Sequence, residues 1–174
     1  MAEGRCFFAL WPGEEVRERL ALEAKRASSK GRVQHPGDLH LTLVFLGPVK
    51  DAQWPCVEVA AAGIRGLPFT LDIQRTGYWL RPRILWAAPT ETPAALSRLV
   101  ADLNLGLGDC GFASERRAYK PHVTLLRKVV GAVPGVIDPP IRWPVSEFVL
   151  ATSGAAEPGM PRYRVLRRWP LLPG

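Results

Sequence analysis

The stretch "HLTLVFLG" at residues 40–47 returns 82 residues later as "HVTLLRKV" at residues 122–129. Each begins with a histidine, an apolar residue, a threonine and a leucine, and together they use two of the three histidines in the chain. Both stretches are rich in the β-branched and apolar residues that are typical of strands. Two strands that open on the same pattern predict a fold in which one unit occurs twice.

The segments around the two stretches follow the same order in each half of the chain. A strand and then a helix are expected before each His-x-Thr strand, which indicates a degenerate internal duplication rather than a solenoid. Periodicity and end signals predict the elements. Strands are expected at 5–12, 40–47, 68–79, 83–89, 120–128, 142–153 and 162–171, helices at 13–31, 51–66 and 92–108, and Gly/Pro-rich loops at 128–141 and 154–161.

The side chains of a strand alternate between its two faces, so each motif separates polar from apolar residues. His40 and Thr42 share one face, and the leucines next to them point the other way. His122 and Thr124 share a face in the same manner. We therefore expect two imidazoles and two hydroxyls to surround one groove if the two halves face each other.

Such a constellation suits the displacement of one oxygen by another at phosphorus. Imidazole titrates near neutral pH, so one ring can accept a proton from the attacking oxygen while the other gives a proton to the leaving oxygen. Threonine hydroxyls can donate hydrogen bonds to the non-bridging phosphate oxygens. We predict His40 and His122 as the catalytic residues, with Thr42 and Thr124 as phosphate-binding residues.

The sequence does not favour a metal site, and no cofactor is expected. Two histidines without a nearby carboxylate or cysteine make a poor zinc set, because three protein ligands are usual. Asp38 is the one candidate for a third ligand, and nothing in the sequence positions it. His35 lies off the repeated pattern, in a predicted loop, and is expected to be non-essential.

The three cysteines, Cys6, Cys56 and Cys110, are widely spaced and odd in number. We interpret each as a small buried apolar residue rather than a nucleophile or part of a disulfide framework. The apolar run near the N-terminus is too short for a signal peptide, and no run has the length of a membrane span. A cytoplasmic protein without membrane contact is therefore expected.

The formal net charge is +7, from 23 basic and 16 acidic residues, and most of the basic residues are arginines. Guanidinium groups form planar, bidentate contacts with phosphate, so the balance favours a polyanion as partner. An arginine-rich composition can equally reflect a G+C-rich genome, so the charge alone leaves the nature of the partner open.

Three segments together resemble a known family. "LHLTLVFLG", "YKPHVTLLR" and the closing "SEFVLATS…YRVLRRWPL" resemble the 2H phosphoesterase superfamily, in particular the RNA 2′,3′-cyclic phosphodiesterases, which are also called 2′-5′ RNA ligases. The resemblance implies one domain over residues 1–174 with an α+β fold. Two pseudo-symmetric lobes, with antiparallel sheets flanked by helices, would surround a central cleft.

The resemblance also implies an activity and a set of roles. The activity would be metal-independent opening of a 2′,3′-cyclic phosphate at an RNA end to a 2′-phosphate. His40 would be the acid for the leaving O3′, and His122 would be the base for water. The expected partner is RNA with a 2′,3′-cyclic phosphate end, and a monomer is expected.

Arg127 would bind the substrate phosphate according to the resemblance, but its position raises a difficulty. It lies five residues after His122, so strict alternation places it on the opposite face of the strand. It reaches the cleft only if the strand ends, twists or bulges after Leu125. Phe45 has the same offset from His40 and is a candidate for stacking on a base. A place for Phe45 in the core is favoured by the usual burial of aromatic residues.

Two other functions stay open at this stage. One is a 2′-5′ RNA ligase that joins 2′,3′-cyclic phosphate and 5′-hydroxyl ends. The other is a non-catalytic RNA-binding module. The presence of both histidines and both threonines argues against the binding module, because binding alone does not need paired titratable groups.

Overall fold

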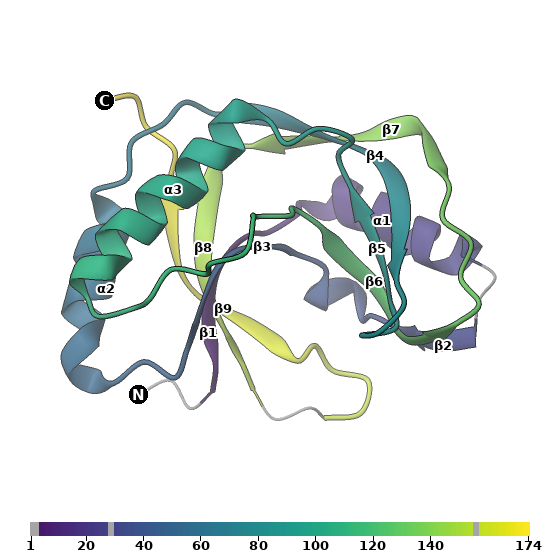
Figure 1. Cartoon of the computed structure of the whole chain (residues 1–174), viewed down its shortest axis with the longest axis horizontal. Helices are drawn as coiled ribbons and strands as arrows, with labels where there is room; N and C mark the ends of the chain where they lie inside the picture. Colours follow the sequence, from purple (N-terminus) through teal and green to yellow (C-terminus); the bar gives the residue numbers. More distant parts are fainter. Residues whose placement is uncertain (1–3, 28–29, 155–156) are drawn as a thin grey trace.

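The structure, a computed structural model, describes residues 4–27, 30–154 and 157–174. Over these residues it has an α+β fold, as predicted (Figure 1). The helical elements are α1 Glu14–Arg26, η1 Pro36–Asp38, η2 Asp51–Gln53, α2 Trp54–Ala62 and α3 Ala94–Asp109. The strands are β1 Cys6–Leu10, β2 Lys30–Val33, β3 Leu41–Gly47, β4 Phe69–Trp79, β5 Ile84–Ala88, β6 Val123–Val130, β7 Val136–Val145, β8 Glu147–Ser153 and β9 Tyr163–Pro170.

All the strands pair antiparallel in one sheet of order β7-β4-β5-β6-β3-β1-β8-β9, with β2 added on β6. The two strands that follow the histidines, β3 and β6, are neighbours at the middle of this order. They are joined at one paired position, Leu41 opposite Val123. The two expected sheets are therefore two halves of one sheet, and the repeated motifs meet at the seam.

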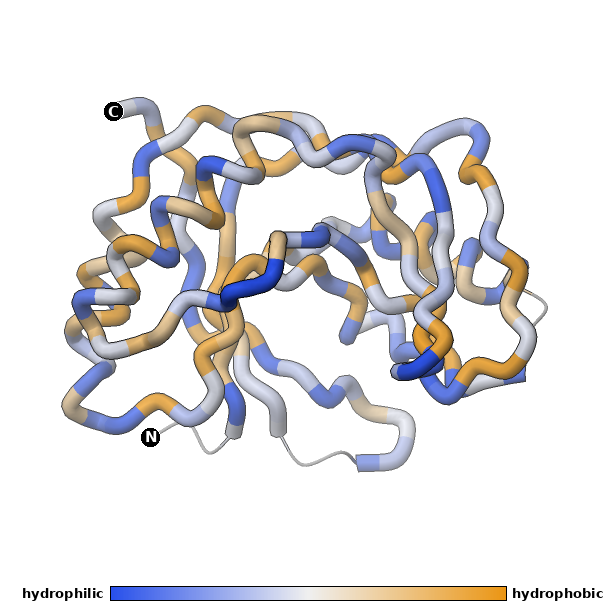
Figure 2. Tube along the Cα trace, viewed as in Figure 1, coloured by the Kyte–Doolittle hydropathy of each residue, from blue (hydrophilic) through white to orange (hydrophobic). Residues whose placement is uncertain are grey.

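The helices cross over between these two halves. Helix α1 follows β1 in the chain but packs against β6 and β7 of the other half. Helix α3 follows β5 but packs against β3, with α2 beside it (Figure 1). Hydrophilic and hydrophobic residues alternate along α3 (Figure 2), and most of its large apolar residues are buried, with Leu105 as an exposed exception. Each half of the sheet is thus covered by a helix that belongs, by chain order, to the other half.

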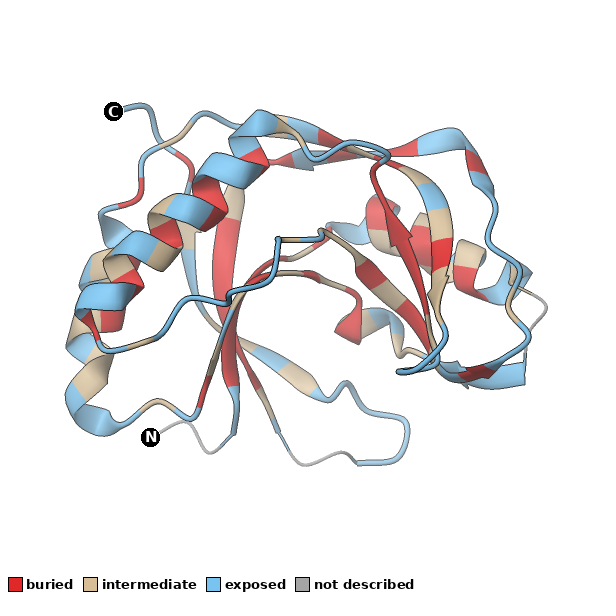
Figure 3. Cartoon of the chain, in the orientation of Figure 1, coloured by how far each residue is buried: buried red, intermediate tan, exposed pale blue. Residues whose placement is uncertain are grey.

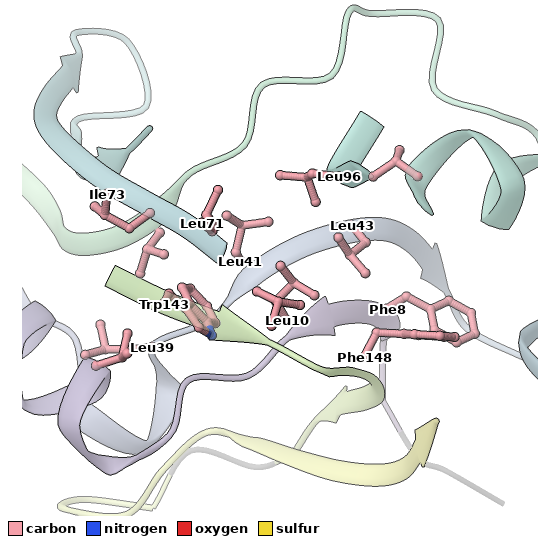
Figure 4. Close-up of a cluster of buried hydrophobic side chains, with 14 of the residues drawn as sticks. Phe8, Leu10, Leu39, Leu41, Leu43, Leu71, Ile73, Leu96, Trp143 and Phe148 are labelled. Atoms are coloured by element: carbon pink, nitrogen blue, oxygen red, sulfur yellow. The ribbon is translucent and has the colours of Figure 1, made fainter. Parts of the chain in front are cut away.

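The main core lies between the sheet and these helices. Leu41 and Leu43 of β3 belong to the same buried cluster as Leu71 and Ile73 of β4, so the two halves share one core (Figure 4). The central strands are largely buried (Figure 3). Because Leu41 and Leu43 point into this core, period-two alternation turns His40 and Thr42 to the uncovered face of the sheet.

The predicted loop at 128–141 is wrong in its second part. Strand β7 begins at Val136 and includes Pro139 and Pro140. Proline cannot donate a hydrogen bond to a neighbouring strand and is therefore confined largely to sheet edges. Strand β7 is an edge strand paired only with β4 in the strand order. The edge position explains how a proline-rich segment joins the sheet.

The predicted strand at 142–153 is two strands rather than one. Strand β7 pairs with β4, whereas β8 pairs with β1 and β9. The chain therefore passes from one half of the sheet to the other around Ser146, whose carbonyl accepts a hydrogen bond from the Leu171 N–H. Residues 30–33, assigned in part to a helix, instead form β2.

The prediction that all three cysteines are unpaired is also wrong. Cys56 and Cys110 form a disulfide that joins α2 to the end of α3, with their Cα atoms 5.6 Å apart. Only the tertiary packing of the two helices brings these residues together, across 54 positions of sequence. Cys6 is free and buried, as expected. Because Cys56 and Cys110 are joined, they do not support the expectation of a protein from a reducing compartment.

Over the described parts of the chain, no helix is both long enough and apolar enough to cross a membrane.

Candidate active site

His40 and His122 stand immediately before β3 and β6, and the backbone holds both rings in the same way. The Nδ1 atom of His40 lies 2.7 Å from the Asp38 carbonyl oxygen, and that of His122 lies 2.8 Å from the Lys120 carbonyl oxygen. A carbonyl oxygen only accepts hydrogen bonds, so Nδ1 carries the proton in each ring. The Nε2 atom of each neutral ring is therefore left with a lone pair.

The antiparallel register brings the two motifs together. Leu41 pairs with Val123, so one step along either strand places His40 beside Thr124 and His122 beside Thr42. Neighbours of this kind have their Cβ atoms about 5 Å apart on the same face. The charge of His122 lowers the pKa of His40, in agreement with a short separation between the two rings. The structure thus gathers all four residues that the sequence singled out.

Aromatic rings enclose His40. Trp11 stacks on its ring at 5.2 Å between centroids, and Phe7 and Tyr163 approach at 4.8 Å and 5.0 Å. This burial lowers the pKa of His40 to about 4. The hydrogen bond to the Asp38 carbonyl and the Asp38 charge raise that pKa, while the charge of Arg127 lowers it further.

Asp38 holds two parts of this enclosure together. Its carbonyl binds the His40 ring, and its buried carboxylate accepts hydrogen bonds from the backbone N–H groups of Arg162 and Tyr163 at 3.0 Å and 2.9 Å. Tyr163 in turn meets the His40 ring edge-on. The sequence suggested Asp38 only as a metal ligand. Its actual partners lie more than a hundred positions away, where no local pattern reveals them.

His122 has a different neighbourhood. Trp79 meets its ring edge-on at 4.5 Å, and Trp86 lies 5.4 Å beyond Trp79. Burial lowers the pKa of His122, the hydrogen bond to the Lys120 carbonyl raises it, and the charge of Arg127 lowers it. A Cβ atom on Gly77 would overlap the Trp86 indole, so a glycine is needed for this ring to lie against β4. Sequence reasoning did not identify either tryptophan as part of the site.

A bulge in β6 turns Arg127 toward the face of the sheet that carries the histidines. Thr124 pairs with Trp86, but the next pair is Leu126 with Leu85, so β6 holds one more residue than β5 at this point. Leu125 and Leu126 are consequently both buried, and Arg127 returns to the face of Thr124. The sequence-based condition for Arg127, a bulge after Leu125, is met. Its charge lowers the pKa of both histidines.

A groove of about 1190 Å³ opens beside His122 and Thr42. One wall is the loop between α3 and β6, parts of which are strongly hydrophilic (Figure 2) and which brings Arg116, Arg117 and Lys120 to the groove together with Glu115. Phe45 also lines the groove and is 59% exposed, so its expected place in the core is wrong. The groove therefore offers an exposed aromatic ring and several cations next to the paired histidines.

Tyr119 and His35 lie at the edge of this arrangement. Tyr119 lines the groove, and its hydroxyl donates a hydrogen bond to the Thr42 carbonyl at 2.9 Å. The Nδ1 atom of His35 accepts a hydrogen bond from the Gly37 N–H and caps η1. In the described part of the chain, no three His, Cys, Asp or Glu side chains gather where they could hold a metal ion.

Comparison with known proteins shows to which family the chain belongs. The model of the 2′-5′ RNA ligase superfamily matches residues 12–157. The chain belongs to this superfamily. It is 36% identical over 172 residues to the RNA 2′,3′-cyclic phosphodiesterase of Escherichia coli, with 96% of each chain covered. It is 34% identical over 184 residues to the protein of the same name from Thermus thermophilus, with 96% of this chain and 90% of that one covered.

Solved structures agree. The crystal structure of E. coli LigT complexed with 3′-AMP superposes with a TM-score of 0.88 at 32% identity, and covers 97% of this chain and 98% of that one. The family resemblance drawn from the His-x-Thr motifs is confirmed, and so is the α+β fold. Because relatives of nearly the same length are named phosphodiesterases, the prediction of an enzyme rather than a non-catalytic module is also confirmed.

Proposed function

We propose that this superfamily member hydrolyses 2′,3′-cyclic phosphate ends of RNA to 2′-phosphates, without a metal ion, by acid–base catalysis between His40 and His122. The observation that carries the proposal is the pair of Nε2 atoms left free by matching Nδ1–carbonyl hydrogen bonds, on neighbouring strands. The names of the bacterial relatives support the reaction. Two imidazoles side by side are sufficient for both proton transfers.

In the proposed reaction His122 acts as the base and His40 as the acid. The Nε2 atom of His122 takes a proton from water, whose oxygen attacks phosphorus. The bond between phosphorus and O3′ breaks, and O3′ takes the proton from Nε2 of His40. The phosphate stays on O2′. The cycle closes when His122 returns its proton to solvent and His40 regains one.

Binding of the phosphate anion supports protonation of His40. In the free protein its pKa of about 4 leaves the ring neutral at pH 7. A phosphate anion beside the ring favours the imidazolium form, and the stacked Trp11 face also stabilises a positive ring. Thr42 and Thr124 donate hydrogen bonds to the non-bridging oxygens, and Arg127 pairs with their charge.

The groove beside His122 suits the rest of an RNA strand. Phe45 presents an exposed ring on which the terminal base can stack, as single-stranded RNA commonly does on aromatic side chains. The basic wall formed by Arg116, Arg117 and Lys120 follows the phosphate backbone. The net charge of +7 adds a general attraction for a polyanion.

The test is to incubate the purified protein, in EDTA, with an oligoribonucleotide that ends in a 2′,3′-cyclic phosphate and to map the product ends. A 2′-phosphate formed at an undiminished rate is expected. Activity that disappears in EDTA and returns with zinc or manganese would contradict the metal-free mechanism. A 3′-phosphate product would contradict the assignment of O3′ as the leaving oxygen.

A further inference from the structure

One side chain fixes the segment that leads into His122 to the other half of the sheet. The hydroxyl of Tyr119 donates a hydrogen bond to the carbonyl oxygen of Thr42 at 2.9 Å. Thr42 belongs to the first His-x-Thr motif, on β3, whereas Tyr119 stands three residues before the histidine of the second. The two strands, both described in full, are paired only at Leu41 and Val123. The Tyr119 bond therefore joins the two motifs where the sheet itself joins them weakly.

The Tyr119 hydroxyl is a permanent donor in this bond. Its side chain packs against the main core, and burial raises the pKa of Tyr119 above its ordinary value. The hydroxyl therefore keeps its proton throughout the pH range in which imidazoles titrate. The residues before it, 113–118, are exposed and make no hydrogen bond to other described parts of the chain. Tyr119 is thus the first fixed point after the basic wall of the groove.

The link from Tyr119 to His122 is short and conformationally restricted. Only Lys120 and Pro121 lie between them. The proline ring fixes its own φ angle and confines the residue before it to extended conformations. The Lys120 carbonyl, which accepts the Nδ1–H bond of His122 at 2.8 Å, therefore has little freedom once Tyr119 is fixed. A displacement of Tyr119 would move this carbonyl and, with it, the imidazole.

The first motif has a counterpart of this anchor. The carbonyl that holds the His40 ring belongs to Asp38, whose carboxylate accepts hydrogen bonds from two backbone N–H groups at the start of β9. Each carbonyl that holds a catalytic ring thus lies in a segment that a long-range hydrogen bond fixes to another strand. The Asp38 anchor carries a charge that raises the pKa of His40, whereas the Tyr119 hydroxyl is neutral. Tyr119 can therefore act on His122 through position alone.

We propose that Tyr119 is a positioning residue for the reaction, which keeps the Nε2 atom of His122 directed at the attacking water by fixing the Lys120 carbonyl relative to β3. The inference rests on the proposed function, because it concerns the base of that reaction. Tyr119 acts through His122 rather than on the reacting atoms. Without the bond to Thr42 the Lys120 carbonyl moves away from Nδ1, and the ring loses both its fixed tautomer and its fixed direction.

The charges around His122 stay in place when the hydroxyl is removed. Arg127 lowers the pKa of His122 by its charge, and His40 lies across the seam between the two strands. Arg75 and Lys120 line, together with His122, a smaller pocket of about 350 Å³ on the β4–β5 side, and the groove wall adds one glutamate and two arginines. Replacing the tyrosine by phenylalanine changes none of these charges. A lower pKa of His122 in that variant would report a weaker bond to the Lys120 carbonyl, because this bond raises the pKa in the wild type.

The experiment compares Tyr119→Phe with Tyr78→Phe in the full chain. Tyr78, on β4, is half-buried like Tyr119 and donates the same kind of hydrogen bond, to the Val129 carbonyl at 3.0 Å. Its side chain packs against the core and holds no segment that leads to a histidine. Denaturant titrations should show similar losses in the free energy of unfolding for the two variants. A purely structural role of Tyr119 therefore predicts that the two variants behave alike.

Nuclear magnetic resonance of the imidazoles measures the position of the ring without any need for catalysis. The chain has three histidines, and His35→Gln and His40→Gln variants assign their signals. In Tyr119→Phe we expect the titration of His122 to move to lower pH and part of its population to change to the Nε2–H tautomer. The His40 signals should stay as in the wild type, and Tyr78→Phe should leave both rings unchanged.

Steady-state kinetics on a cyclic-phosphate oligonucleotide gives the second readout. Tyr119→Phe should lower kcat by about fivefold, the size of one lost hydrogen bond, with KM unchanged. The acid limb of its pH profile should move to lower pH with the titration of His122. Tyr78→Phe should keep the wild-type kcat and profile. Pro121→Ala, which frees Lys120 without removing the hydroxyl, should move the His122 titration in the same direction and provides the test if Tyr119→Phe does not fold.

The two readouts separate this proposal from the proposed function. A His122 titration and tautomer that are the same in Tyr119→Phe, Tyr78→Phe and the wild type would overturn the positioning role, whether or not the protein hydrolyses cyclic phosphates. Equal losses of kcat in the two tyrosine variants would overturn it as well. A shifted His122 titration in a protein that does not open cyclic phosphates would refute the proposed function alone.

Discussion

His40 and His122 occupy equivalent places in the two halves of the sheet, and each donates its Nδ1 proton to a carbonyl two residues earlier. Their surroundings differ. Trp11, Phe7 and Tyr163 enclose the first ring, whereas a pocket and a groove meet at the second. The two motifs share the contact that fixes the tautomer and differ in the surroundings that control access and pKa. One motif can in this way supply two different proton-transfer roles.

The largest effect is expected from removing either imidazole. His40→Ala and His122→Ala should each lower kcat by about 10²–10⁴, or roughly 3–5 kcal/mol in the barrier, which is the usual contribution of one proton transfer. Steady-state kinetics on a cyclic-phosphate oligonucleotide measures this loss. His35→Ala, which removes only the cap of η1, should stay near wild type; a loss as large as the other two would contradict the pairing.

The pH profiles of the same variants distinguish the two rings. The free-protein pKa of about 4 for His40 and the lowered pKa of His122 place the maximum of kcat/KM between about 4 and the ordinary imidazole value of 6.5. His40→Ala should lose the alkaline limb of the wild-type bell, and His122→Ala the acid limb. The two limbs report the coupled pair in the wild type. The opposite pattern of losses would exchange the proposed roles.

The enclosure of His40 should also appear in the stability of the fold. Unfolded His40 takes up a proton near pH 6.5, whereas folded His40 does so only near 4. Between these values the unfolded chain binds more protons, so the free energy of unfolding falls as the pH falls, by about 3 kcal/mol in total. Denaturant titrations at pH 7 and pH 4 measure the loss. His40→Gln should remove more of it than His122→Gln, and equal effects would contradict the difference in enclosure.

Arg127 and Phe45 stand at the same offset from the two histidines, and their replacement should have different consequences. Arg127→Ala removes a charge-assisted phosphate contact and should lower kcat/KM by about tenfold to a hundredfold. It should also move the pH profile to higher pH, because the Arg127 charge lowers the pKa of both histidines. Arg127→Lys, which keeps the charge, should keep the profile. A lower kcat/KM with an unmoved profile would separate Arg127 from the histidines.

The smallest effect is expected from Phe45→Ala. Loss of base stacking should raise KM for an oligonucleotide by about tenfold, with little change in kcat, because one stacked base is worth roughly 1–3 kcal/mol. The fold should be unaffected, since the ring is 59% exposed. Phe45→Trp should restore the wild-type KM. A KM that stays the same in Phe45→Ala would remove Phe45 from the substrate site.

The part of the site that the sequence predicted depends on local geometry. Period-two alternation places His40 with Thr42 and His122 with Thr124 whatever the rest of the fold, and the structure agrees. The bulge that brings in Arg127 could be stated only as a condition, because it depends on how β6 pairs with β5.

The features that the sequence missed arise from contacts between distant segments. The Cys56–Cys110 disulfide and the bonds from Asp38 to the start of β9 join residues that only the folded chain brings together. The prolines of β7 indicate a loop unless one knows that this strand lies at an edge. The aromatic enclosure of His40 likewise requires β1 and β9 to be placed beside the first motif.

The position of β1 in the sheet has a consequence for synthesis on the ribosome. This strand lies between β3 and β8, and Cys6 pairs with Thr152 near the other end of the chain. Translation therefore produces β1 well before β8, and one row of the N–H and C=O groups of β1 stays unpaired until β8 has emerged. Contacts between segments so far apart form slowly. Throughout that interval the nascent chain carries an apolar strand with an unpaired edge, which is the kind of segment that chaperones bind and that associates with other nascent chains.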